Sequence, residues 1–265
     1  MDAVRTADRD RYLAALYAPE DKRQAVLALY AFNAEISGIR DRVSEPIPGE
    51  IRLQWWRDVI ASGNRDAGAG HPVATALMAA IETYSLPSAA FENYLEARIF
   101  DLYDDPMPSR TDLEGYCGET ASALIQLAAL VLDADEAPKQ AELSGHAGCA
   151  QAITGLLRLL PIHRARGQCY VPRDILSAAG TTPEEFVANA AAQSSRHAVE
   201  AMAALAREHL RAFERGVKDL PVALRPAFLP LALTPTYLDR LGRGKDGMSS
   251  LRKHLLMLKA ASRGW

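Results

Sequence analysis

The apolar residues of this chain recur at helical spacing along most of its length. Around the stretch from Tyr30 to Pro46, apolar side chains follow one another at steps of three and four, which places them on one face of a helix. This stripe consists of Ala25, Leu29, Phe32, Ile36, Ile39 and Val43. The segment 183–217 is rich in alanine and poor in β-branched residues, a composition that favours helix. Because no segment alternates convincingly with a period of two, the sequence predicts an all-α protein.

Proline, glycine and short polar runs divide the helical pattern into segments. The predicted helices cover residues 7–17, 21–44, 49–62, 72–84, 87–103, 111–132, 138–165, 183–217, 222–241 and 248–262. Thr111 and Glu114, three residues apart, predict a capping box at the start of the helix at 111–132. No internal repeat, low-complexity linker or shift in composition interrupts the chain, so we expect one domain over residues 1–265.

The composition excludes several classes of protein. The chain has 265 residues, 49% of them hydrophobic, which is enough for a large core. Its 30 basic and 33 acidic residues give a net charge of −3, which argues against a general nucleic-acid-binding protein. Cys117, Cys149 and Cys169 are widely spaced and form no CxxC pair, so we expect buried thiols and neither disulfides nor a zinc site.

The two ends of the chain bear on targeting and membrane contact. Acidic residues interrupt the N-terminal segment, which does not have the pattern of a signal peptide. No window of about 18 residues is apolar and free of charge, so we expect no transmembrane helix and a cytoplasmic protein. The basic, amphipathic segment 248–265 ends in Trp265. It either packs on the domain as an ordinary surface helix or lies on a membrane surface.

Three short stretches carry groups of chemical interest. The stretch GRGKDG at 242–247 follows a helix rather than a strand, so we interpret it as a loop and not as a dinucleotide site. Trp55 and Trp56 are neighbours on a predicted helix, so one should enter the core while the other flanks it. Three aspartates near the end of the helix at 87–103 are weak candidates for a metal site, or else a solvated helix end. These are Asp101, Asp104 and Asp105.

Basic residues gather between positions 158 and 173, where a helix is predicted to end near Pro161. Such a cluster either binds a phosphate or carboxylate group or is simply a charged helix end and loop. The candidate anion-binding residues are Arg158, Arg164, Arg166, Tyr170, Arg173 and Asp174.

Several stretches together resemble the squalene/phytoene synthase family over nearly the whole chain. LYAFNAEISGIRD at 29–41 is similar to its first motif, L-Y-A-F-C-R-x-x-D-D-x-x-D, and LEGYCGETAS at 113–122 to its E-x-Y-C-x-x-V-A-G helix. AQAITGLLRLLPIHRARGQCYVPRDIL at 150–176 is similar to its second motif and the flap that follows. The resemblance implies a single isoprenoid-synthase-like helical bundle around a central cavity. Active members join two prenyl diphosphates head to head, and two aspartate clusters hold the magnesium that neutralises the diphosphate.

Matching the motifs residue by residue places other residues where the magnesium ligands belong. The paired aspartates of the first motif fall on Ser37 and Gly38, and only its last acid is kept, as Asp41. In the second motif the asparagine falls on Gly155 and the two aspartates on Leu159 and His163, and histidine is a poor magnesium ligand. The residual catalytic candidates that match the family are Asp41, Tyr30, Tyr116 and Asp101, and the matching flap and helix residues are Arg158, Tyr170 and Asp174.

One branch of the family departs from the motifs in the same way, and FNAEISGIRDRVSEP followed by RLQWWRD resembles it. It is the branch of mitochondrial assembly factors for respiratory complex I, with bacterial relatives. The resemblance implies a non-catalytic protein that binds a complex I subunit or assembly intermediate, or an isoprenoid-like lipid, at the inner-membrane surface. We expect a bacterial protein with no cofactor. The alternatives are a divergent prenyltransferase, which would need magnesium, and a peripheral lipid-binding protein.

Overall fold

The computed structural model describes residues 2–241 and 248–265. Their regular structure consists of helices without a strand, which confirms the all-α prediction. The longer helices are α3 (Glu20–Ser37), α4 (Pro46–Ala61), α5 (Pro72–Tyr84), α6 (Ser88–Ala97), α8 (Ala123–Leu132), α9 (Ala141–Arg158), α13 (Gln193–Gly216) and α16 (Ser250–Arg263). The shorter ones are α1 (Asp2–Ala7), α2 (Arg9–Ala15), α7 (Arg110–Cys117), α10 (Leu160–Ala165), α11 (Arg173–Ala178), α12 (Pro183–Ala188), α14 (Arg225–Phe228) and α15 (Thr234–Arg240).

Tighter and wider turns connect these helices. The 3₁₀ segments are Arg40–Arg42, Arg65–Gly68, Arg98–Leu102, Ala137–Gln140, Val217–Asp219, Val222–Leu224 and Leu229–Leu233. The segment Gly118–Ser122, between α7 and α8, is π-helical. The stretch 242–247, which the sequence predicts to be a loop, lies outside the described residues.

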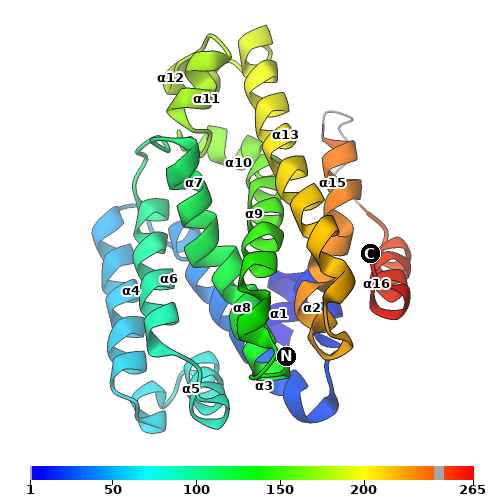
Figure 1. The fold of residues 1–265 in the computed structure, drawn as a ribbon. Coiled ribbons are helices and arrows are strands. Elements are labelled where there is room, and N and C mark those ends of the chain that lie inside the picture. Colours follow the sequence, from blue (N-terminus) through cyan, green and yellow to red (C-terminus); the bar gives the residue numbers. More distant parts are fainter. Residues whose placement is uncertain (1, 242–247) are drawn as a thin grey trace.

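The helices form a bundle with α9 at its centre (Figure 1). The helix α13 packs along α9, whereas α3 packs against α5 and α8, and α4 lies beside α6. Aromatic rings fill the core between α3, α4 and α6: Phe32 contacts Trp56, Phe91 and Tyr94 with ring centroids 5.2 to 5.6 Å apart. Trp56 is buried and Trp55 is exposed, in agreement with the rotation of about 100° between helical neighbours.

Several helix ends differ from the sequence prediction. The helix expected over 21–44 ends at Ser37, where Gly38 is the C-cap, and the chain continues into a 3₁₀ turn. A Cβ at Gly38 would lie 3.1 Å from the carbonyl oxygen of Ala34, so this tight turn favours glycine. The helix expected over 138–165 breaks at Leu159, and Pro161 lies in the first turn of the separate helix α10, where its missing N–H is tolerated.

Other boundaries shift because of caps and prolines. The helix expected over 7–17 begins at Arg9 and ends at Ala15, because the carboxylate of Asp8 accepts a hydrogen bond from the backbone N–H of Arg11 and caps α2. The cap of α7 is Ser109 and not the predicted Thr111. The helix expected over 183–217 is interrupted between α12 and α13, and that over 222–241 consists of short pieces, since prolines recur in it. The sequence prediction missed α1 and α11.

The π-helical segment sets how closely two central helices approach. A Cβ at Gly148 on α9 would lie 2.2 Å from Oγ of Ser122 and 2.3 Å from its backbone nitrogen, so only glycine fits there. The Ser122 hydroxyl donates a hydrogen bond to the carbonyl oxygen of Gly145, about one turn earlier on α9. Thr120, in the same segment, donates to the carbonyl oxygen of Tyr116 at 2.6 Å. These contacts fix the segment between α7 and α8 against the central helix.

One stretch of the described chain, Arg110–Leu132, is long and apolar enough to cross a membrane by length and composition, and the sequence prediction did not single it out. Of its most apolar window, 61% is buried inside the bundle, as in the core helix of a globular protein.

The three cysteines are free and buried, which confirms the predicted buried thiols. Helix α16 packs its Met257 and Ala260 side against the bundle and leaves three of its leucines exposed.

Candidate functional site

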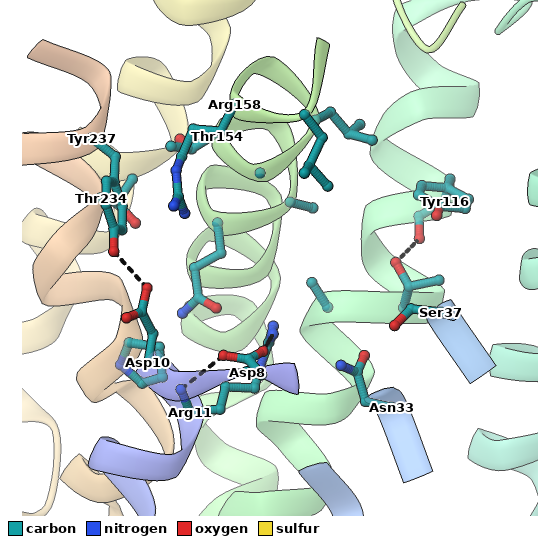
Figure 2. Close-up of a pocket in the computed structure, with 18 of the residues that line it drawn as sticks. Asp8, Asp10, Arg11, Asn33, Ser37, Tyr116, Thr154, Arg158, Thr234 and Tyr237 are labelled. Carbon is teal, nitrogen blue, oxygen red and sulfur yellow. Dashed lines mark hydrogen bonds and ion pairs between the residues drawn. The ribbon is translucent and has the colours of Figure 1, made fainter. Parts of the chain in front are cut away.

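A central cavity lies between α2, α3, α9 and α15. It consists of two hollows of about 280 and 470 Å³ that share lining residues. Figure 2 shows Arg158 and Tyr237 on one side of the open space, with Asn33, Ser37 and Tyr116 on the other. The shared lining residues are Asp8, Asn33, Ser37, Arg98, Tyr116, Leu156 and Leu159. The cavity that the family resemblance implied is therefore present, and polar and apolar side chains both line it.

Each carboxylate in the described lining of the cavity is bound by a cationic side chain. The pairs join carboxylates to arginine or lysine nitrogens at 2.5 to 2.9 Å, and two of them link distant parts of the chain. They are Asp8–Arg11, Asp10–Lys253, Asp41–Arg166 and Asp101–Arg98. Each of these carboxylates therefore already has a cationic partner within the protein.

Asp101 is the centre of a buried hydrogen-bond network. Its Oδ1 accepts hydrogen bonds from the hydroxyls of Tyr116 at 2.8 Å and Tyr170 at 2.7 Å. Its Oδ2 accepts from Arg98 at 2.9 Å, and Arg98 also donates to the Tyr116 and Tyr94 hydroxyls. Burial raises the pKa of Tyr116 well above its ordinary value, and burial likewise raises the pKa of Tyr170. Both phenols therefore stay protonated and act as donors to Asp101.

Arg158 is the arginine of the cavity that has no carboxylate partner among the described residues. Its guanidinium lies over the Tyr237 ring, 3.7 Å from the centroid, and its Nε is buried without a hydrogen-bond partner. The side chains of Thr154 and Gln151, one and two turns earlier on α9, also line the cavity. Gln151 Nε2 and Thr154 Oγ1 are likewise buried without partners. These groups are suited to hold an anionic or strongly polar group.

The structure separates the predicted anion-binding residues. Arg158 lines one hollow of the central cavity, and Arg166 and Tyr170 line the other. Arg164 lies in a different pocket, beside α13. The two remaining residues are outside the cavity: Arg173 is exposed, and Asp174 accepts hydrogen bonds from the backbone N–H groups of Arg110 and Ile175.

Magnesium does not fit the residues at the two motif positions. Ser37, Gly38, Leu159 and His163 line the cavity where the matched motifs carry aspartates, and Asp41 is paired with Arg166. Burial lowers the pKa of His163, whose ring packs on Tyr170. No group of three or more His, Cys, Asp or Glu side chains within residues 2–241 and 248–265 is arranged to hold a metal ion. Gly155 also leaves open space, since a Cβ there would meet nothing within 4 Å.

The three weak metal candidates do not converge. Asp101 binds its tyrosines and Arg98, while Asp104 is exposed and pairs with Arg40 at 3.4 Å. Asp105 is exposed. Tyr30 is buried in the core and does not appear in the described lining of either hollow.

Sequence reasoning missed much of the lining. Arg98 and Asp101 are three residues apart, a spacing that brings side chains together on helical turns and could have indicated the pair. Asp8 and Arg11 have the same spacing and could have been found in the same way. Asp10 and Tyr237 gave no such signal, because Asp10 pairs with Lys253 and Tyr237 donates to Asp10 from the other end of the chain. The missed residues are Asp8, Asp10, Arg11, Asn33, Gln151, Thr154 and Tyr237.

This chain is similar to named proteins in sequence and to solved structures in fold. The chain is 30% identical over 241 residues to the NADH dehydrogenase (ubiquinone) complex I, assembly factor 6 of Bos taurus, an alignment that covers 91% of this chain and 72% of the relative. It is 29% identical over 243 residues to the Homo sapiens protein of the same name, with 92% and 73% covered. A crystal structure of a dehydrosqualene synthase in complex with ligand shares the fold, with a TM-score of 0.81 and 20% identity over 98% of this chain and 93% of that one.

The expectation of a bacterial protein is wrong, because eukaryotic assembly-factor relatives dominate the similar proteins. That expectation rests on the first residues of the chain, which carry no information about the organism. A family model described as squalene/phytoene synthase matches residues 4–259, which is nearly the whole chain. The motifs, the helical bundle and this match agree: the chain belongs to the squalene/phytoene synthase family.

Proposed function

We propose that the chain assists the assembly of a respiratory NADH dehydrogenase, complex I, by binding and without prenyl transfer. The observation that carries the proposal is the pairing of every carboxylate in the described cavity lining with an arginine or lysine. A magnesium-dependent transferase needs free carboxylates facing the diphosphate. The names of the relatives from Bos taurus and Homo sapiens support the same function.

The partner in this proposal is a complex I subunit or assembly intermediate, met at the inner-membrane surface. The central cavity keeps a binding role, with Arg158, Gln151 and Thr154 as donors for an anionic or polar group of an isoprenoid-like lipid. Such a ligand would stabilise the folded protein by mass action and need not react.

The test is deletion of the gene in the cell that carries it, followed by measurement of assembled complex I on native gels and of NADH oxidation. We expect both to fall, with the other respiratory complexes unchanged, and the intact gene to restore them. Purified protein incubated with farnesyl diphosphate and magnesium should give no condensed product. Turnover that Asp41→Ala abolishes, with normal complex I in the deletion strain, would overturn the proposal in favour of a divergent prenyltransferase.

A second candidate function is peripheral lipid binding through α16. Its exposed stripe consists of Leu251, Leu255 and Leu258, at steps of four and three, with Arg252 and Lys259 on the same helix. Flotation with vesicles of anionic lipid tests this function. Leu255→Asp should release the protein, and binding indifferent to this change and to salt would contradict it.

A further inference from the structure

A second pocket lies outside the central cavity, at the end of the bundle where α10, α13 and α15 meet (Figure 1). It measures about 330 Å³, and its lining shares no residue with the central cavity. We call it the Arg164 pocket. Its described lining residues are Arg164, Ala190, Ser195, Arg196, Val199, Glu200, Ala203, Arg207, Leu238 and Leu241.

Arg164 is a cation without an acid partner among the described residues. Its guanidinium lies over the Phe186 ring, 4.4 Å from the centroid, which holds the plane of the group. Its Nε and Nη2 atoms are buried and have no hydrogen-bond partner. Burial lowers the pKa of Arg164, in agreement with this position. Buried and unpaired guanidinium nitrogens are costly, and a carboxylate or phosphate would satisfy both with a matching fork.

The other charges of the pocket reinforce this preference. Arg196 donates to the carbonyl oxygen of Ala191, and Arg207 pairs with Asp239 at 3.5 Å. Glu200 is the acid among the described lining residues. With Asp239 counted beside Arg207, three arginines face two acids, so the surroundings of the pocket are positive by one charge and attract anions.

The lining of the pocket also contains apolar side chains. These are Val199 and Ala203 on α13, with Leu238 and Leu241 from α15 and its end. Cations together with apolar side chains fit a ligand with a charged head and an apolar body. The volume is near the lower limit for small-molecule sites, which restricts the apolar body to a short chain.

We propose that the Arg164 pocket binds a small amphiphilic anion, in which a carboxylate or phosphate monoester is joined to a short apolar chain. The head lies on Arg164 and the chain lies on Val199 and Leu238. This site is independent of the proposed assembly function and of the central cavity.

The test is calorimetry of the full chain with octyl phosphate and octanoate, with octanol and inorganic phosphate as probes of the tail and head alone. We expect saturable one-to-one binding of at least one amphiphilic anion, and binding of octanol and phosphate that is weaker by about ten-fold or more. Arg164→Met should weaken the binding by a similar factor. Arg158→Met, which removes the cation of the central cavity, and Arg211→Met, which removes an exposed charge from α13, should leave it unchanged.

Val199→Phe gives a second test, because it fills the apolar half of the pocket and keeps Arg164. It should weaken octyl phosphate binding as well. The anion could come from a membrane lipid or from a free amphiphile, and vesicles of phosphatidic acid distinguish the two. If the vesicles displace bound octyl phosphate, the ligand is a membrane lipid. If octyl phosphate stays bound, the ligand is a free amphiphile. Absence of saturable binding, equal affinity in Arg164→Met, or loss only in Arg158→Met would overturn the proposal.

Discussion

Asp101→Asn tests whether the buried network holds the bundle together. Asp101 is 8% exposed and accepts hydrogen bonds from Tyr116, Tyr170 and Arg98. The substitution keeps the size of the side chain but removes its charge and places an amide NH₂ among donors. It therefore leaves the Arg98 guanidinium buried without its carboxylate.

The expected loss of stability follows from these contacts. Removing one partner of a buried ion pair costs about 3–5 kcal/mol. The entropy of unfolding is about 2.1 cal/mol/K per residue. For 265 residues this gives about 0.56 kcal/mol/K, so we expect the melting temperature to fall by about 5–9 °C.

The matched control is Asp104→Asn. Asp104 is paired with Arg40 at 3.4 Å, but its side chain is 56% exposed, and such pairs contribute less than about 1 kcal/mol. Thermal melting followed by circular dichroism, with urea titration to check that the m-value is unchanged, measures both variants. If the free energies of unfolding of the two variants differ by less than about 1 kcal/mol, the buried network stabilises the fold no more than an exposed ion pair does.

Three further predictions concern the central helix and the cavity. Gly148→Ala should destabilise the protein by several kcal/mol, because its Cβ would lie 2.2 Å from Ser122 Oγ. Its control is Gly155→Ala on the same helix, where a Cβ meets nothing within 4 Å, and this change should stabilise the protein by up to about 1 kcal/mol. Urea denaturation measures both variants, and equal effects would contradict the prediction. Burial holds the pKa of His163 below about 6.5, so below that pH the unfolded chain binds a proton that the native state lacks, and stability falls as the pH falls. His163→Phe should therefore lose less stability than the unaltered protein between about pH 7 and pH 5 in urea titrations, and parallel losses would refute the assignment. Arg158→Met should weaken the binding of farnesyl diphosphate in the presence of chelator by about ten-fold or more. The reason is that a charge-assisted hydrogen bond contributes about 1.5–3 kcal/mol. If calorimetry shows unchanged affinity, the anion binds elsewhere.

Much of the fold could be predicted from the sequence because its helices have long apolar stripes. Helical geometry alone indicated that one of Trp55 and Trp56 is buried and the other is not. The pairing of Asp41 with Arg166 could not be predicted, because the two residues are 125 positions apart and each is ordinary in its own segment. Local patterns describe faces of helices, whereas the site depends on which faces meet.

The arginine cluster shows the same limit on a smaller scale. Arg164 and Arg166 are close in sequence, which made a shared anion site one of the two interpretations of the cluster. Two residues apart on a helix means a rotation of about 200°, so their side chains leave on nearly opposite sides. The structure accordingly places Arg166 in the central cavity and Arg164 in its own pocket.

The π-helical segment Gly118–Ser122 holds one residue more than an α-helical turn. The wider turn absorbs that residue, so the helix before it and the helix after it keep the faces they would have on either side of an ordinary turn. Deleting one residue here, such as the exposed Glu119, would therefore convert the segment to α-helix while Tyr116 still faces Asp101 and α8 still faces the core. A single-residue deletion within α8 itself would instead turn each following residue by about 100°. The segment is thus the place in this helix where the loss of one residue should be tolerated best.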